Sequence, residues 1–386
     1  MEFELWWLLA LPLFFGLGWL AARVDIRHAM SESRSLPASY FKGLNYLLNE
    51  EPDKAIEAFI EVVKVDSDTV DLHFALGGLF RKRGEVERAT RMHQNLVERD
   101  DLPDEQKLKA LSELGQDYLK AGLLDRAEDI FNRLEKTAYA GQARKFLLEI
   151  YVQVKDWHKA IAAARELEPI SSQPYHVEIA HYLCELATIE NVHGNPQAAR
   201  AHLDEALTVN RNCVRATLLL GEIEAASGAH EAAIAVWKRV EAQSSVHLAL
   251  ISERLMDCYR ELRREAEGVT WLRGALARHP SFELFNAVFA GTLKLQGVPA
   301  AYQLAQDELR RNPSLRGLDR YVEAELLDAP AERRQDLQII KGVVQNYSQR
   351  QSMYQCEKCG FKARKFFWHC PACGSWDSFP PQKREE

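Results

Sequence analysis

A pattern that recurs at a regular interval runs through the middle of the chain and constrains its fold more than any other feature. Four positions of the first copy recur with the same spacing in the second: Gly43, Tyr46, Ala55 and Phe59 are followed by Gly77, Phe80, Ala89 and His93. A fixed period of roughly 20 to 50 residues is typical of units that cannot bury their apolar face alone. Neighbouring units must then stack on one another, so the period predicts an array with one continuous core.

The third copy identifies the kind of unit. Its small and bulky positions are Leu114, Gly115, Tyr118, Gly122, Ala127 and Phe131. This spacing matches the tetratricopeptide pattern, in which two antiparallel helices pack with small residues where they cross. Later copies centre on Ala160, Ala199, Ala233, Gly268 and Ala301. We therefore predict an all-α solenoid with about eight repeats over residues 36–313, closed by a degenerate or capping pair over 314–350.

Such a stack coils into a superhelix with a concave groove that suits a peptide or a protein segment. The first helix of each repeat supplies candidate groove residues, on the side away from the motif glycine and tyrosine. These candidates for partner binding are Phe74, Arg81, Lys109, Gln116, Lys145, Glu149, His181, Arg215 and Glu222. Their mixed charge favours a polypeptide partner over an apolar ligand. The alternative for any single one is a solvated helix face.

The N-terminus carries an uncharged, largely apolar run from Leu5 to Ala22. This is about the length that crosses the hydrocarbon core of a bilayer, so we predict a transmembrane anchor at residues 1–22 and a linker at 23–35. The alternative, a cleaved signal peptide, requires a basic stretch before the run, where this chain has Glu2 and Glu4.

The residues that flank the run predict its orientation. Trp6, Trp7 and Trp19 lie near its ends, where indole rings favour the headgroup zone. Basic residues follow the run at Arg23 and Arg27, and positive charge marks the cytoplasmic side of a membrane segment. The sequence therefore predicts a single-pass protein with its body in the cytoplasm.

Composition and motifs exclude several classes of function. The formal charge of −7 argues against general nucleic-acid binding. The sequence has neither a phosphate-binding loop of the form G-x-x-x-x-G-K-[ST] nor a G-x-S-x-G nucleophile turn. His230 and Glu231 begin a zinc-protease motif, but Ile234 stands where its second histidine is needed. We expect a binding protein and no enzyme.

Two Cys-x-x-Cys-Gly motifs near the C-terminus form the strongest local signal in the chain. Cys356 and Cys359 make the first pair, and Cys370 and Cys373 make the second. In a reducing compartment such pairs hold a metal ion far more often than they form disulfides. Four thiolates make a closed site, which is typical of a structural metal, and the donor set admits one zinc or iron ion. We assign residues 351–386 to this module.

A module this small cannot fold around its own core, so we expect the metal and docking onto the solenoid to share the stabilisation. Trp368 or Phe367 is the predicted contact with the solenoid. His369 is expected to pack and not to ligate. The other cysteines, Cys184, Cys213 and Cys258, are interpreted as small buried apolar residues.

The order of membrane segment, tetratricopeptide repeats and terminal cysteine knuckles resembles that of the lipopolysaccharide assembly protein B family of Gram-negative bacteria. Four local strings are similar to it: LFRKRGEVERATRMHQNLVE from Leu79, GQDYLKAGLLDRAEDIFNRL from Gly115, VEIAHYLCELA from Val177 and WHCPACGSW from Trp368. The resemblance extends over nearly the whole chain and implies that the terminal module is rubredoxin-like.

The resemblance implies a non-catalytic adaptor at the cytoplasmic face of the inner membrane. Such an adaptor regulates lipopolysaccharide synthesis by helping a membrane AAA+ protease degrade the deacetylase of the lipid A pathway. An inner-membrane sensor protein would act on it through the transmembrane region, and a homodimer is left open. The alternatives are rubredoxin-type electron transfer at an iron centre and an assembly scaffold for lipopolysaccharide synthesis and transport without a proteolytic role.

Overall fold

The computed structural model describes residues 38–381 apart from residues 50, 66–69, 172–173 and 352. The predicted anchor at 1–22 and linker at 23–35 lie outside the described residues. Within the described residues, no helix combines the length and apolarity needed to cross a membrane. The chain divides into two compact units, residues 1–150 and 151–386, which are described separately.

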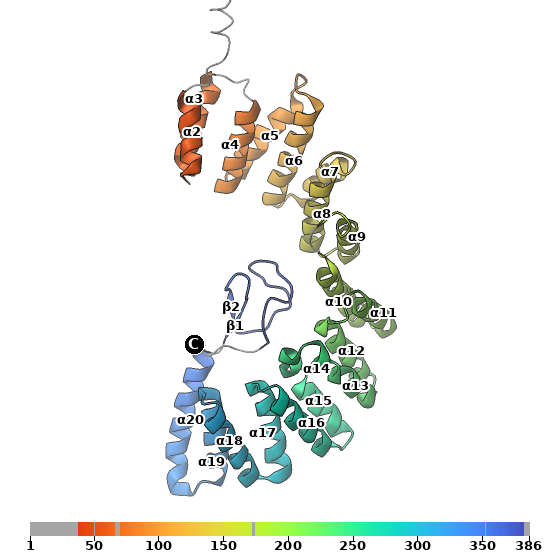
Figure 1. Ribbon diagram of the computed structural model, residues 1–386, viewed down its shortest axis with the longest axis vertical. Coiled ribbons are helices and arrows are strands. Elements are labelled where there is room, and N and C mark those ends of the chain that lie inside the picture. Colours follow the sequence, from red (N-terminus) through yellow and green to blue (C-terminus); the bar gives the residue numbers. More distant parts are fainter. Residues whose placement is uncertain (1–37, 50, 66–69, 172–173, 352, 382–386) are drawn as a thin grey trace, which may run out of the picture. The chain divides into compact units, whose positions relative to one another are not determined.

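The first unit consists of helical hairpins (Figure 1). Its helices are α2 (Ala38–Leu48), α3 (Pro52–Val65), α4 (Val70–Arg83), α5 (Val86–Glu98), α6 (Asp104–Lys120) and α7 (Leu124–Leu134), and α8 (Ala140–Val154) runs across the division between the units. Contacts join α2 to α3, α4 to α5 and α6 to α7. These pairs are the helical hairpins that the period of the sequence predicts.

The glycine of each motif lies where a helix meets the bulky side chain of its partner. A Cβ atom built on Gly43 would lie 2.3 Å from the Phe59 ring, and one on Gly115 would lie 2.8 Å from the Phe131 ring. Cβ atoms do not approach side chains this closely, so only glycine permits the observed helix spacing. The repeated glycine is therefore a packing requirement of the hairpin.

The second hairpin offers a matched test of this requirement, because Gly77 and Gly78 are neighbours on α4. A Cβ on Gly77 would lie 2.3 Å from His93 Nε2, whereas one on Gly78 would meet nothing within 4 Å. We expect Gly77→Ala to lower the free energy of unfolding by about 1–3 kcal/mol through overpacking. Gly78→Ala should leave it unchanged or raise it by up to about 1 kcal/mol, through the better helix propensity of alanine. Urea unfolding midpoints of the two variants measure the difference, and equal midpoints would contradict the packing argument.

The second unit continues the array of hairpins and ends in the small module. Its helices are α9 (Trp157–Leu167), α10 (His176–Val192), α11 (Pro196–Val209), α12 (Val214–Ala226), α13 (His230–Lys238), α14 (Val240–Gln243), the 3₁₀ helix η2 (Ser245–Leu250), α15 (Ser252–Glu261), α16 (Glu265–Arg278), α17 (Phe282–Gln296), α18 (Val298–Arg311), α19 (Leu315–Asp328) and α20 (Ala331–Gln351). Contacts pair α10 with α11, α12 with α13, α15 with α16, α17 with α18, and α19 with α20. The short helices α14 and η2 lie between the α12–α13 pair and the α15–α16 pair.

Two serines that follow prolines start helices of this unit. Ser281 Oγ accepts a hydrogen bond from the Leu284 N–H (3.3 Å), and Ser314 Oγ accepts one from the Gly317 N–H (3.0 Å). Each serine thereby satisfies one of the free N–H groups in the first turn of its helix. The preceding Pro280 lies between α16 and α17, and Pro313 lies between α18 and α19.

The terminal module contains little regular structure. Strands β1 (Tyr354–Gln355) and β2 (Lys362–Ala363) pair antiparallel, with Tyr354 opposite Ala363 and Gln355 opposite Lys362. A single bridge joins His369 to Trp376. Cys356, Cys370 and Phe379 form its small buried core. Both units are thus built from helix pairs, as predicted, and a small cysteine-bearing module follows the last helix in the chain.

Candidate metal centre

Each Cys-x-x-Cys-Gly motif forms the same tight turn. In the first turn the Gly360 N–H donates to the Cys356 carbonyl (2.9 Å), and in the second the Gly374 N–H donates to the Cys370 carbonyl (2.9 Å). Both glycines have positive φ, 76° and 67°, a conformation that other residues adopt with strain. The glycine after each second cysteine therefore lets the chain fold back and bring the paired thiols together.

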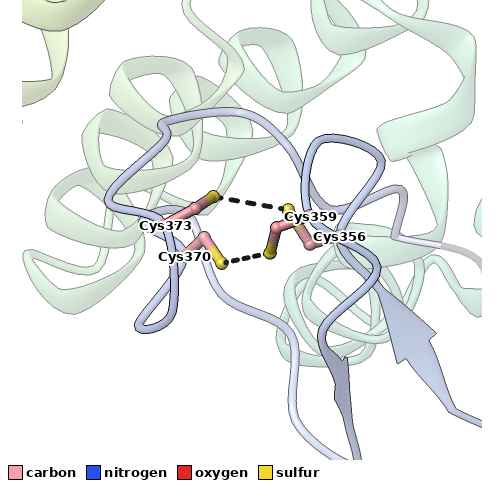
Figure 2. A group of neighbouring side chains, drawn as sticks. All are labelled: Cys356, Cys359, Cys370 and Cys373. Atoms are coloured by element: carbon pink, nitrogen blue, oxygen red, sulfur yellow. Dashed lines mark hydrogen bonds between the residues drawn. The ribbon is translucent and has the colours of Figure 1, made fainter. Parts of the chain in front are cut away.

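The two turns place all four thiols around one point (Figure 2). The four Sγ atoms lie within 4.8 Å of one another. Cys356 Sγ is 3.8 Å from Cys373 Sγ, and Cys359 Sγ is 3.7 Å from Cys370 Sγ. A tetrahedron with metal–sulfur bonds of about 2.3 Å has edges of about 3.8 Å. The sulfur positions therefore fit a single tetrahedrally bound metal ion.

The surroundings of the thiols favour the thiolate form at two of the four ligands. Burial alone would raise the pKa of Cys356, but hydrogen bonding with the Ser378 side chain and with the N–H groups of Cys359 and Lys358 lowers it to about 6. The Ser375 hydroxyl and N–H lower the pKa of Cys373 in the same way. Sulfurs that accept hydrogen bonds from backbone N–H groups are prepared to ligate a cation.

The module packs against α10 of the second unit through Trp376. The His181 ring on α10 is fully buried and stacks on the Trp376 ring with a centroid distance of 4.7 Å and an interplanar angle of 16°. His181 Nε2 lies 2.9 Å from Asp377 Oδ2. Trp376 and Asp377 follow closely after the second knuckle, so the turn that holds the metal ligands also positions this contact.

Helix α12 and the 3₁₀ helix η2 also contact the module. We call the whole contact the ribbon dock. It consists of His181, Arg215 and His247 on the solenoid and of Trp368, Trp376 and Asp377 on the module. The Arg215 guanidinium on α12 lies over the Trp376 ring, 5.8 Å from its centroid. His247 on η2 stacks on Trp368 at 5.5 Å and 6°. Trp368 is also packed against the apolar core that α12 to α17 share.

Two relatives align with nearly the whole chain. Lipopolysaccharide assembly protein B of Escherichia coli (strain K12) is 34% identical over 377 residues, which cover 97% of each chain. The protein of that name from Haemophilus influenzae (strain ATCC 51907 / DSM 11121 / KW20 / Rd) is 31% identical over 395 residues and 98% of each chain. The chain belongs to the lipopolysaccharide assembly protein B family.

Family models agree with both parts of the structure. A rubredoxin metal binding domain matches residues 354–381, and tetratricopeptide repeats match residues 42–90, 112–174 and 185–246. Among solved structures, the Naa15/Naa10 complex bound to HypK-THB is similar at a TM-score of 0.40 and 13% identity, over 81% of this chain and 51% of that chain. That likeness is too distant to inform function.

Of the residues predicted at the metal site and its contacts, the structure brings the four cysteines together. Trp368 packs on the solenoid as predicted, whereas Phe367 packs on Phe379 inside the module at 5.8 Å. The His369 ring packs against the Trp376 ring at a centroid distance of 4.4 Å and an angle of 30°, in accordance with its predicted packing role. His247 and Asp377 were not predicted as contact residues, since nothing in their local sequence marks them as such.

The predicted partner-binding residues occupy varied environments in the first unit. Phe74 is 8% exposed, and Lys109 Nζ lies over its ring at 4.3 Å. Arg81 donates to Asp117 Oδ1 (2.8 Å) and to Glu113 Oε2 (2.5 Å), and Gln116 donates to the Ser112 carbonyl (3.3 Å). Lys145 and Glu149 are exposed on α8. Partner binding by these residues stays a prediction.

The remaining candidates lie in the second unit. His181 and Arg215 belong to the ribbon dock, so the chain's own module covers the groove positions that the sequence analysis left open to a partner. Glu222 is half-buried and lies 2.9 Å from Arg254. Contact with the module therefore accounts for the positions of His181 and Arg215, and partner binding by Glu222 stays a prediction.

The ribbon dock is expected to weaken in acid through His247. Burial lowers the pKa of His247 below its ordinary value of 6.5, against the opposing charge of Asp377. A histidine with a lowered pKa stabilises the docked state while it is neutral, so the stabilisation is complete above about pH 6.5 and falls as the pH drops below that value. Hydrogen exchange of the module between pH 5.5 and 7.5 measures the effect.

Two variants isolate the contribution of His247. His247→Phe keeps the stacked ring and should remove most of the pH dependence of module protection. His158→Phe changes an exposed histidine on α9 and should leave that dependence intact. Equal pH profiles for the wild type and His247→Phe would contradict the role assigned to His247.

Proposed function

We propose that this chain is a non-catalytic adaptor of the inner membrane that limits lipopolysaccharide synthesis. In this proposal it presents the deacetylase of the lipid A pathway to a membrane AAA+ protease, which degrades it. Membership of the lipopolysaccharide assembly protein B family over 97% of the chain is the observation that carries the proposal. The solenoid of helix pairs supports it, because such arrays bind other polypeptides through extended surfaces.

The predicted anchor at 1–22 gives the adaptor its mechanism. Only the short predicted linker at 23–35 separates Ala22 from the first repeat, so the solenoid would stay close to the membrane surface on the cytoplasmic side. Tethering converts encounters with other membrane-bound proteins into nearly intramolecular events and raises their effective concentration. An inner-membrane sensor protein that engages the anchor would then control access to the adaptor.

The metal centre has a structural part in this proposal. Cys356, Cys359, Cys370 and Cys373 would hold one zinc or iron ion, which supplies four bonds that tie the two turns together. The turns in turn present Trp368 and Trp376 to α10, α12 and η2. The module thereby fixes part of the groove and leaves the rest of the array for partners.

The cellular half-life of the deacetylase tests the adaptor proposal. We expect the half-life to lengthen severalfold in cells that lack this chain, and to lengthen equally when residues 1–22 are deleted. The full-length chain expressed from a plasmid should restore rapid turnover. An unchanged half-life in cells without the chain would overturn the proteolytic role and favour an assembly scaffold.

Electron transfer is the alternative that the metal centre itself favours. Cys359 and Cys373 are exposed, and a tetrathiolate iron ion can cycle one electron. Metal analysis of the purified protein separates the two functions. Near-stoichiometric iron with a visible absorption change that reverses on reduction and reoxidation would support electron transfer, whereas zinc supports the structural role.

A further inference from the structure

Two buried cysteines outside the metal centre lie in contact with each other. Cys184 on α10 is 0% exposed and Cys213, the residue that precedes α12, is 1% exposed. Their Sγ atoms are 4.0 Å apart. A disulfide requires a sulfur–sulfur distance of about 2.05 Å, so the pair lies about 2 Å from a bond. The two residues are 29 positions apart, and the packing of two successive hairpins brings them together.

The two thiols have unlike surroundings. The hydrogen bond with Cys184 lowers the pKa of Cys213 to about 7, and nearby His181 and the Ala216 N–H add to the effect, whereas burial and Asp377 oppose it. Burial raises the pKa of Cys184 well above its ordinary value, as does the hydrogen bond with Cys213. Thiolates at the start of a helix and near a positive charge are typical of reactive cysteines. The position of Cys213 at the N-terminus of α12 makes it the candidate nucleophile of the pair.

We propose that Cys184 and Cys213 are a redox modification site, at which a peroxide oxidises the two thiols to a disulfide between α10 and α12. The Cys213 thiolate attacks one peroxide oxygen, the O–O bond breaks, and the leaving hydroxide takes up a proton to become water. Cys213 is then a sulfenic acid.

The Cys184 sulfur closes the bond by attacking the sulfur of that sulfenic acid. The S–O bond breaks, and the hydroxyl group leaves as a second water with the Cys184 proton. Two thiols and one hydrogen peroxide thus give one disulfide and two waters, with the thiols oxidised by two electrons and the peroxide reduced by two.

The site lies among residues of the ribbon dock. His181 is on the same helix as Cys184, Arg215 is two residues after Cys213, and both contact Trp376. An ion pair between Arg215 and Glu185 (2.8 Å) already joins the same two helices beside the thiols. The disulfide would covalently connect the two helices on which the module stands.

The test uses the full-length, metal-loaded protein treated with hydrogen peroxide, alkylated and mapped as peptides without reduction. We expect the Cys184–Cys213 linkage as the main product, formed before metal is lost and reversed by dithiothreitol. Its rate should exceed the oxidation rate of Cys258, a buried thiol with a raised pKa, by roughly tenfold or more. Metal release or linkage of the ribbon cysteines before any Cys184–Cys213 bond forms would overturn the proposal.

Single replacements test the assigned roles and provide controls. Cys184→Ser should stop at a Cys213 sulfenic acid that dimedone traps, and Cys213→Ser should leave Cys184 unoxidised. Cys258→Ser should form the disulfide at the wild-type rate. Circular dichroism and metal content establish whether each variant folds. If a serine variant does not fold, the corresponding alanine variant, Cys184→Ala or Cys213→Ala, is used in its place. Oxidation of Cys184 at the wild-type rate without Cys213 would overturn the assignment of the nucleophile.

Discussion

Replacing Cys356 with serine is expected to abolish metal binding and to unfold the terminal module. Cys356 is 1% exposed, and its sulfur accepts hydrogen bonds from the N–H groups of Lys358 and Cys359 that a metal-bound thiolate would retain. Binding of a structural zinc ion contributes about 10–16 kcal/mol to folding in small metal-dependent domains, so losing one of four ligands removes much of what holds this module. Metal content should fall from about one ion per chain to near zero, and the variant should no longer complement a strain that lacks the chain.

Cys373→Ser should have the same outcome, because the intact first knuckle, Cys356 and Cys359, cannot hold the ion alone. Cys258→Ser is the matched control, since Cys258 is a buried cysteine of α15 and not a ligand. Metal analysis, thermal melting and complementation of a strain that lacks the chain measure the three effects. Unchanged melting and complementation in both ligand variants would contradict a structural metal centre.

Replacing Trp376 with alanine is expected to separate docking from metal binding. The Trp376 ring contacts His181, Tyr182 and Arg215, but its side chain is not a metal ligand. Truncating a half-buried tryptophan should cost roughly 2–3 kcal/mol of docking free energy, somewhat less than the cost at a fully buried position. The module should then keep its metal and become more susceptible to proteolysis.

Phe361→Ala provides the control for the docking variant. Phe361 is an aromatic residue of the same module, 39% exposed, and its ring lies outside the ribbon dock. Limited proteolysis and metal analysis of the two variants separate the effects. If Trp376→Ala lost its metal as fully as a ligand variant does, docking and metal binding could not be separate contributions.

The hairpins and the cysteine turns were predictable because they depend on short-range pattern. Gly43 and Phe59 are sixteen positions apart, as are Gly77 and His93, so one hairpin contains both members of each contact. The turn at Cys356 needs only five consecutive residues, with the glycine supplying the required positive φ. The spacing of residues close together in the sequence was therefore enough to predict both the hairpins and the cysteine turns.

The ribbon dock and the thiol pair were not predictable, because they depend on how successive hairpins stack. His181 and Arg215 occupy groove positions of α10 and α12, and the sequence does not indicate that a module near the C-terminus covers them. Cys184 and Cys213 lie in separate apolar patterns, and only the packing of their helices places the sulfurs 4.0 Å apart. Such contacts between repeats do not produce a repeating pattern in the sequence.

The contacts of His93, Asp117 and Arg81 in the first unit were also not predictable from the sequence. The motif position that is Phe59 in one repeat and Phe131 in another is His93 in the repeat between them. His93 Nδ1 lies 2.5 Å from Asp117 Oδ2, and Asp117 in turn accepts a hydrogen bond from Arg81. From the sequence His93 is a departure from the pattern, whereas the structure gives it a partner on α6.

Hydrogen exchange of the second unit, with and without metal, tests most directly the claim that a metal-held module stabilises the groove it covers. Chelating the metal from the wild-type chain should speed amide exchange in α10, η2 and the start of α12, while α2 to α7 should exchange at unchanged rates. Trp376→Ala should show the faster exchange with metal still bound. Unchanged exchange in α10 and η2 after complete metal removal would contradict the account.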